Sequence, residues 1–414
     1  MTVQKLRDLN ISQVLILYSF TIISFQFYGY IGFDSQVLKA LLFVLIPIWF
    51  LICITDIIKI KGDIIVKLMK GLIFSLFIAI VSSYLFWDQG FIFTYRAMVS
   101  NFVLPLTFFL LVKYRASQKS IERYIVFFTV LYAIIWLYAV INAPLILFDI
   151  GGVDDLDDSR GFWRIFIAGQ YFIYISYFLY LTRLTYDFKI RYLIFAFLLF
   201  ILIILTLTRQ TILWTSVTTI YFIYKINKKF TFCLLLVFVL SYSSLYILLK
   251  NSDTVIGKLI ELTEHQQDLN NNSREDIRIV EYRYFFSKYS KNLITDIIGN
   301  GYPHSETAFG KRYQSINDRL DLYLSDVGYA KIFADTGLFG LILYILLFIS
   351  CIRAKIPKEI EYAKLFIIYM IPANIAAAFY TGCIGISVCC YLIYSNKINT
   401  KSLHTSKSDK LNIQ

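Results

Sequence analysis

The chain has 414 residues, of which 58% are hydrophobic and 16% are charged, and its formal net charge is +12 at pH 7. Soluble domains average about 45–50% apolar and about 25% charged residues, so this composition excludes an ordinary soluble globular protein. The mean hydropathy of +0.64 points the same way. We therefore expect a chain that is embedded in a membrane.

The apolar runs are mostly about 20 residues long, which is the length that a helix needs to cross a hydrocarbon core of about 30 Å. A chain in lipid satisfies its backbone hydrogen bonds internally, and long continuous runs favour helices over a closed barrel. These runs lie near residues 11–30, 37–58, 68–87, 98–112, 124–148, 165–182, 192–207, 210–224, 230–249, 327–352, 362–380 and 383–395. They predict an all-α polytopic membrane protein with about twelve transmembrane helices.

Basic residues gather in alternate connections between the apolar runs. These clusters lie at 59–70, 113–123, 183–191, 225–229, 353–364 and 397–410. The intervening short connections are poor in basic residues or acidic, as in GGVDDLDDSRG at 151–161. Because short basic loops stay in the cytoplasm, we expect both termini inside, and two short helices rather than one over 362–395. The first run, after Lys5 and Arg7, has no cleavage site behind it and is expected to be a retained span.

One long polar stretch interrupts the pattern. It covers residues 250–326, follows helices 1–9 over residues 1–249, and precedes helices 10–12 over 327–396 and a basic tail at 397–414. Long loops cross the membrane largely regardless of their charge, so this one is predicted to be extracytoplasmic. We expect function to reside there, at the outer face of the cytoplasmic membrane.

The cysteines give no sign of a disulfide framework or a metal site. All six fall in or beside apolar runs, and none forms a CxxC pair in a polar loop: Cys53, Cys233, Cys351, Cys383, Cys389 and Cys390. They are interpreted as small core residues. No metal and no cofactor is predicted.

Arginines near the predicted outer surface are candidates for binding an anion. Arg209 lies in LTLTRQTILW, between two spans with almost no loop, where a turn needs no arginine. Arg160 and Arg164 bracket Trp163 in RGFWRIF, and paired guanidinium groups bind phosphate oxygens in a bidentate manner. Anchoring at the membrane surface is the alternative for all three arginines.

The segment NNSREDIRIVEYRYFFSKY, at 271–289, predicts a helix in the long loop, with Ser273 as its N-cap. Arg274 and Arg278 are four residues apart and share one face. Two like charges on one face repel each other unless an anion lies between them. An ordinary solvated face is the alternative.

The segment IIGNGYPH follows this helix. Gly299 and Gly301 allow either a tight turn or the close approach of a ligand. A histidine has a pKa of about 6.5, so His304 is a candidate acceptor of a hydroxyl proton at neutral pH, unless it merely makes loop hydrogen bonds.

The next span begins in SDVGYAKIFADTGLFGLILY, at 325–344. Asp326 is predicted to cap this helix, and Lys331 and Asp335, four residues apart, are expected to pair. Gly337 is expected to allow close helix packing.

The arrangement resembles the O-antigen and capsule repeat-unit polymerases, which are relatives of the O-antigen ligases. The resemblance rests on the arginine of LTLTRQ, on Ser273 and Arg274 at the start of a helix, on GNG at 299–301, and on DVGYAKIFADTGLFGLILY. It implies a many-helix bundle of the membrane glycosyltransferase class and a reaction without metal. The implied donor is a glycan on a polyprenyl diphosphate (undecaprenyl in bacteria), and the implied acceptor is the terminal sugar of a second lipid-linked unit.

The resemblance also implies roles for the candidate residues. Arg209, Arg274 and Arg278 would stabilise the departing diphosphate, with Arg160 and Arg164 as further diphosphate-binding candidates. His304 or Asp326 would accept the proton of the acceptor hydroxyl. The expected partners are membrane lipid and undecaprenyl-diphosphate-linked oligosaccharide, with a chain-length regulator and a flippase as further candidates and no nucleic acid.

Two other functions remain open from the sequence. A lipid-linked oligosaccharide flippase also has about twelve spans, but no internal repeat of the kind that transporters show is visible here. An O-antigen ligase uses the same chemistry, but ligases place a His-Asn type pair where this chain has Ser325 and Asp326. The repeat-unit polymerase is the favoured prediction.

Overall fold

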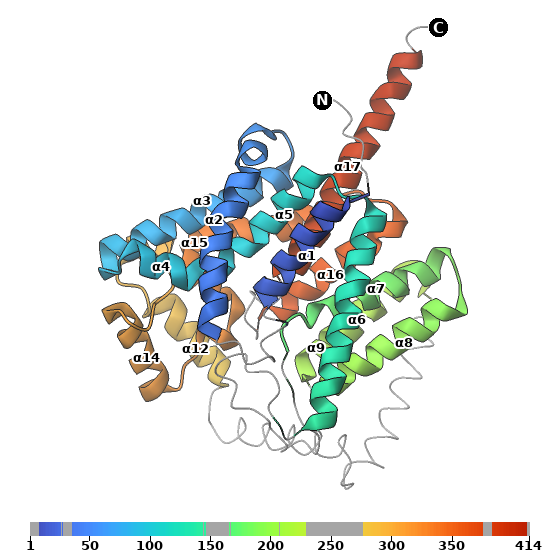
Figure 1. Cartoon of the computed structure of the whole chain (residues 1–414). Coiled ribbons are helices and arrows are strands. Elements are labelled where there is room, and N and C mark those ends of the chain that lie inside the picture. The colour runs from blue at the N-terminus through green and yellow to red at the C-terminus, as the bar shows by residue number, and fades with distance from the viewer. Residues whose placement is uncertain are drawn as a thin grey trace.

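The computed structural model describes residues 8–25, 27, 35–143, 145, 165, 167–206, 208–228, 276–375 and 383–411, with the backbone alone for 35–39 and 398–411. All regular structure in these ranges is helical (Figure 1). Several predicted features lie outside the described residues: the span at 230–249, Cys233, Arg160, Arg164, Ser273 and Arg274.

The described helices follow the apolar runs of the sequence closely. Their bounds are α1 Ile11–Phe25, α2 Ser35–Lys59, α3 Ile64–Trp87, α4 Phe91–Met98, η2 Val99–Phe102, α5 Val103–Tyr114, α6 Gln118–Asn142, α7 Tyr171–Tyr186, α8 Ile190–Leu205, α9 Arg209–Ile226, α12 Ile277–Ser287, α13 Leu293–Ile298, α14 Ala308–Leu320, η3 Leu324–Asp326, α15 Gly328–Arg353, η4 Lys358–Ile360, α16 Glu361–Ala373 and α17 Cys383–Leu411. The expected all-α class is therefore confirmed, and α16 and α17 are two separate helices.

Among the described residues, five helical segments are long and apolar enough to cross a membrane. They are Ala40–Lys59, Ile64–Trp87, Phe91–Tyr114, Gln118–Asn142 and Gly328–Arg353, and the apolar helices α1 and α8 are shorter. Large apolar side chains lie exposed on the outside of these segments, for example Phe74 on α3 and Ile342 on α15. In a membrane protein such side chains face lipid, so the described part of the chain is a helical membrane protein.

Ion pairs identify one end of the bundle. Lys113 at the end of α5 pairs with Asp56 at the end of α2, and Lys397 of α17 pairs with Asp63 at the start of α3. The ends of α7 and α9 pair with the starts of α6 and α16 through Arg183–Glu122 and Lys225–Glu361. We call this the basic end, because the basic connections of the sequence meet there. The opposite end, which carries α12, α13 and α14, is called the loop end. In Figure 1 both chain termini lie at the top, away from α12 and α14.

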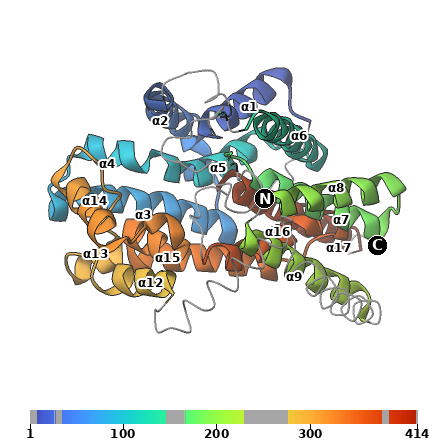
Figure 2. The same ribbon diagram turned by 90° about the horizontal axis from the view of Figure 1, so that it is seen from below.

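Residues 276–327, called the cap, form a small folded unit at the loop end. Figure 2 shows α12, α13 and α14 grouped beside α3 and α15. The cap has a core of its own: Trp87, Phe285, Tyr289, Phe309, Ile316, Leu322, Leu324, Val327, Ala330 and Ala334. Trp87, the last residue of α3, stacks on Phe309 with ring centroids 4.2 Å apart. Burial of these large aromatic side chains fixes the cap on the ends of α3 and α15.

Two glycines, Gly299 of the cap and Gly337 of α15, allow the backbones of the cap and of α15 to touch. Gly337, inside α15, has φ +70° and ψ −175°, so the helix is kinked there. A Cβ at Gly337 would lie 2.3 Å from the carbonyl oxygen of Ile297, and one at Gly299 would lie 2.4 Å from that of Asp335. The kink leaves α15 carbonyls for the cap: Asn300 N–H donates to Ala334 at 2.9 Å. The sequence predicted either a tight turn or the close approach of a ligand at Gly299, whereas the group that approaches it in the structure is the backbone of α15.

Candidate functional site

The first helix of the cap, α12, holds Arg278 and Glu281. Asp276 caps this helix, and its carboxylate accepts from the backbone N–H of Arg278 at 2.9 Å. The prediction of Ser273 as the N-cap residue is therefore wrong for this helix. α12 begins only at Ile277, and Asp276 has the non-helical backbone of an N-cap residue. A carboxylate there also complements the positive end of the helix dipole.

Glu281 is a residue of the candidate site that the sequence did not predict. It is 1% exposed, and its Oε1 accepts the backbone N–H of Tyr323 at 2.8 Å. Burial is the main reason why the pKa of Glu281 is raised to about 7. The Asp326 carboxylate also acts to raise it, whereas the hydrogen bond from the Tyr323 N–H and the Arg278 guanidinium act to lower it. The structure thus brings Arg278 and Asp326, both predicted, into electrostatic contact with a buried acid.

Asp326 does not cap α15 as predicted. It lies in η3, where its carboxylate accepts the hydroxyl of Ser325 at 2.9 Å, and it is exposed. The N-cap position of α15 is Val327, which makes no side-chain cap bond. Asp326 is therefore one residue before the N-cap position of α15. Its carboxylate instead acts electrostatically on Glu281.

His304 is held through its backbone. Its N–H and the hydroxyl of Thr307 both donate to Oε1 of Gln89, at 2.9 and 2.7 Å. Gln89 is fully buried and in turn donates through Nε2 to the carbonyl of Tyr302 at 2.9 Å. The half-buried imidazole lies against Phe93, with ring centroids 5.1 Å apart. His304 therefore contacts α4 and the connection that precedes it, whereas Asp326 acts electrostatically on Glu281 of α12.

Gln89 was not predicted, although the sequence carries a signal for it. It belongs to the short polar break Asp88–Gln89–Gly90 between two apolar runs. A fully buried amide needs partners for both its oxygen and its nitrogen. The cap supplies both donors to its oxygen, and its nitrogen donates to Tyr302 of the cap as well as to Ser83 and Thr94, so Gln89 joins the segment that carries His304 to α3 and α4.

Lys331 and Asp335 form the expected pair, with Nζ and Oδ2 3.5 Å apart. Both side chains are buried, and the Lys331 Nζ lies 3.8 Å from the centre of the Tyr302 ring. The amide of Asn101, in the 3-10 break between α4 and α5, donates to Asp335 at 3.4 Å. Buried charges in a membrane bundle are costly and are kept where they are paired.

Arg209 is the first residue of α9 and is half-buried. The other end of α9 pairs with the start of α16 through Lys225 and Glu361 at the basic end, and α9 packs along α16. Arg209 therefore lies toward the loop end, on the same side of the bundle as Arg278. This is the side that the sequence predicts for both.

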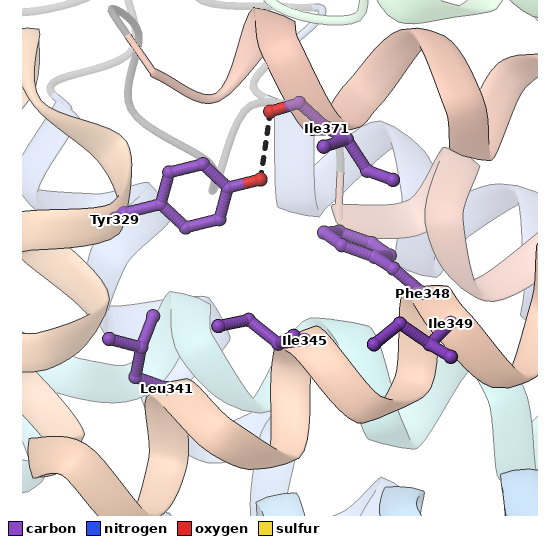
Figure 3. Close-up of a pocket in the computed structure, with 6 residues that line it drawn as sticks. All are labelled: Tyr329, Leu341, Ile345, Phe348, Ile349 and Ile371. Carbon is purple, nitrogen blue, oxygen red and sulfur yellow. Dashed lines mark hydrogen bonds between the residues drawn. The ribbon is translucent and has the colours of Figure 1, made fainter.

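An apolar groove lies between α15 and α16. It has a volume of about 350 Å³ and is lined by Tyr329, Leu341, Ile345, Phe348, Ile349 and Ile371 (Figure 3). Ile345 and Ile349 are 41% and 38% exposed, so the groove opens on the outside of the bundle. Apart from the Tyr329 hydroxyl, the side chains that line it are apolar.

The groove ends in a polar group at the loop end. The Tyr329 hydroxyl donates to the carbonyl of Ile371 at 2.8 Å, as Figure 3 shows. Nearby, Tyr282 of α12 donates to the carbonyl of Ile375 at 2.7 Å. The two tyrosines satisfy carbonyls at the end of α16 and connect the groove with the helix that carries Arg278 and Glu281.

No protein-family model matches the chain, and no curated protein matches it in sequence. Within the described ranges there is no group of three or more His, Cys, Asp or Glu side chains that could hold a metal ion. The five described cysteines are free and buried, as expected of core residues.

Proposed function

We propose that the chain is a membrane glycosyltransferase that joins polyprenyl-diphosphate-linked oligosaccharide repeat units into a polysaccharide, in the manner of the O-antigen and capsule polymerases. One observation carries the proposal. Arg278 and Asp326 act electrostatically on the buried Glu281, and Tyr282 of the same helix α12 contacts the end of α16, which forms one wall of the apolar groove. A ligand with a charged, hydroxylated head and a long hydrocarbon tail fits both parts.

The reaction needs little from the protein beyond charge and position. A hydroxyl oxygen of the acceptor sugar bonds to the anomeric carbon of the donor, while the bond from that carbon to the diphosphate breaks. The electron pair of the broken bond leaves with the lipid diphosphate, and the hydroxyl proton goes to a base. Arg209 and Arg278 stabilise the charge that builds on the leaving group. Arg160, Arg164 and Arg274 remain candidates for the same role.

The membrane orientation in this proposal has the basic end in the cytoplasm. The ion pairs of that end collect the basic connections, which stay inside under the positive-inside rule. The cap then lies on the outer face, with about twelve spans and both termini inside. The donor, the acceptor and the cap would share one compartment.

A transporter of lipid-linked oligosaccharide is the second candidate, and one observation favours it. The helix over 91–114 is broken by η2, and α15 is kinked at Gly337, with the buried Lys331–Asp335 pair close by. Broken helices beside ionisable groups are typical of secondary transporters. The two candidates differ in what they do to substrate that is already on the outer face.

The deciding experiment uses vesicles whose outer leaflet holds lipid-linked single repeat units on the same side as the cap. A polymerase lengthens them into a ladder of chains, whereas a flippase leaves their length unchanged. We expect Arg278→Ala to abolish the ladder at unchanged protein level, because the departing diphosphate loses a stabilising charge. Arg319→Ala is the matched control, since Arg319 is an exposed arginine on α14 of the same cap. Normal ladders with Arg278→Ala would contradict the assignment.

A further inference from the structure

Glu281 has one carboxylate oxygen without a partner. Its Oε1 accepts the Tyr323 N–H at 2.8 Å, whereas its Oε2 is buried and has no hydrogen-bond partner. Almost all buried polar atoms in folded proteins are hydrogen-bonded, and a buried carboxylate oxygen without a donor is costly. A purely structural role at Tyr323 needs one oxygen only, which a glutamine would supply.

The charges around Glu281 suit an acid that exchanges a proton. Asp326 on η3 and Asp276 at the start of α12 both favour the protonated form, and Arg278 on α12 favours the ionised form. Together with burial, they bring the pKa of Glu281 to about 7. A general base works best when its pKa lies near the working pH.

Arg278 and Asp326 are exposed, whereas Glu281 beside them is covered. A sugar hydroxyl therefore meets the exposed pair first. It reaches Glu281 when the side chains that cover the carboxylate move aside. Catalytic hydrogen bonds often form fully only in the complex with substrate.

We propose that Oε2 of Glu281 accepts the proton of the acceptor hydroxyl, in place of His304 or Asp326. This rests on the proposed glycosyl transfer and names its base. As the acceptor oxygen bonds to the anomeric carbon, its proton passes to Oε2, and the electron pair of the breaking bond leaves with the lipid diphosphate. The proton is later released to water, which returns Glu281 to its ionised form.

The test is Glu281→Gln, in which the amide oxygen keeps accepting the Tyr323 N–H but the side chain accepts no proton. We expect chain growth in the vesicle assay to fall roughly 100- to 10,000-fold, the usual range for loss of a general base. Binding of undecaprenyl diphosphate to the purified variant should be unchanged, which also shows that the variant is folded. Glu306→Gln, at an exposed acid of the same cap, is the matched control and should grow chains normally.

The pH profile separates a base from a structural residue. The wild-type rate should rise with pH toward a plateau above about pH 7, and the residual rate of Glu281→Gln should lack this rise. Normal chain growth by Glu281→Gln would overturn the assignment of the base and leave the polymerase proposal intact. Absence of chain growth in the wild type would overturn both.

Discussion

The carboxyl of Glu281 has a pKa of about 7 instead of 4.5, because the folded cap buries it. A raised folded-state pKa means that the stability contributed by the neutral form is fully present below pH 4.5 and is lost as the pH rises through about 7. Each unit of pKa shift corresponds to about 1.4 kcal/mol. The cap should therefore be more stable in mildly acidic than in alkaline buffer.

We expect the melting temperature of the purified protein to fall between pH 5 and pH 8, and Glu281→Gln to weaken this dependence. Thermal unfolding followed at several pH values provides the measurement. Glu306→Gln serves again as the control, because an exposed acid has no comparable burial to relieve. An equal slope in Glu281→Gln and wild type would show that burial of this carboxyl is not what makes the stability pH-dependent.

Some residues of the candidate site could be predicted from the sequence, and others could not. The pairing of Lys331 with Asp335 could be predicted from their spacing alone, because residues four apart on a helix are neighbours. The importance of Glu281 could not, since a glutamate in a polar loop looks solvated until the tertiary packing of α12 on η3 buries it. Gln89 was missed for the same reason.

At the scale of elements, the kink of α15 at Gly337 is the feature with the clearest consequence. Only glycine adopts φ +70° easily, and any side chain here would meet the Ile297 carbonyl. We expect Gly337→Ala to lower stability by at least about 1–2 kcal/mol, the cost of a left-handed backbone for other residues, with the clash in addition. Thermal unfolding and protease sensitivity of the cap measure the effect.

A glycine in an ordinary position provides the comparison. Gly90 starts α4 with φ −53°, and a Cβ there would lie 3.5 Å from Phe93, an ordinary contact. Gly90→Ala should leave the protease resistance of the cap close to that of the wild type. Equal resistance of Gly337→Ala and Gly90→Ala would rule out the backbone contact as the support of the cap.

The positions of the helices were largely predictable, whereas their ends and breaks were not. Hydrophobic runs locate spans because lipid demands apolar length. Which residue takes the N-cap position depends on where the backbone enters the helix. The sequence therefore predicted Ser273 and Asp326 wrongly, and the N-cap positions of α12 and α15 are held by Asp276 and Val327. The apolar run was predicted to begin at 98, whereas the helical segment begins at Phe91, and the 3-10 break η2, which contains Ser100 and Asn101, lies inside that segment.

For the whole molecule, the prediction concerns orientation. In the proposed topology, a cysteine at exposed Ser325 of the cap reacts with a membrane-impermeant thiol reagent from outside intact cells. A cysteine at exposed Lys61 of the basic end reacts only after the membrane is opened. The five described native cysteines are buried, so the background is low once Cys233 is replaced. Labelling of Lys61→Cys but not Ser325→Cys from outside would reverse the topology and exclude the proposed reaction.

The contact between Gly299 and Gly337 has a mechanical consequence. The backbone of the cap contacts the backbone of α15 there, so no flexible side chain lies between them to absorb a displacement of the cap relative to α15. A rotation of the cap is therefore transmitted to α15. The same helix also forms one wall of the apolar groove. Under the proposed function, we expect binding of a lipid tail in the groove and binding of a sugar at the cap to affect each other through this contact.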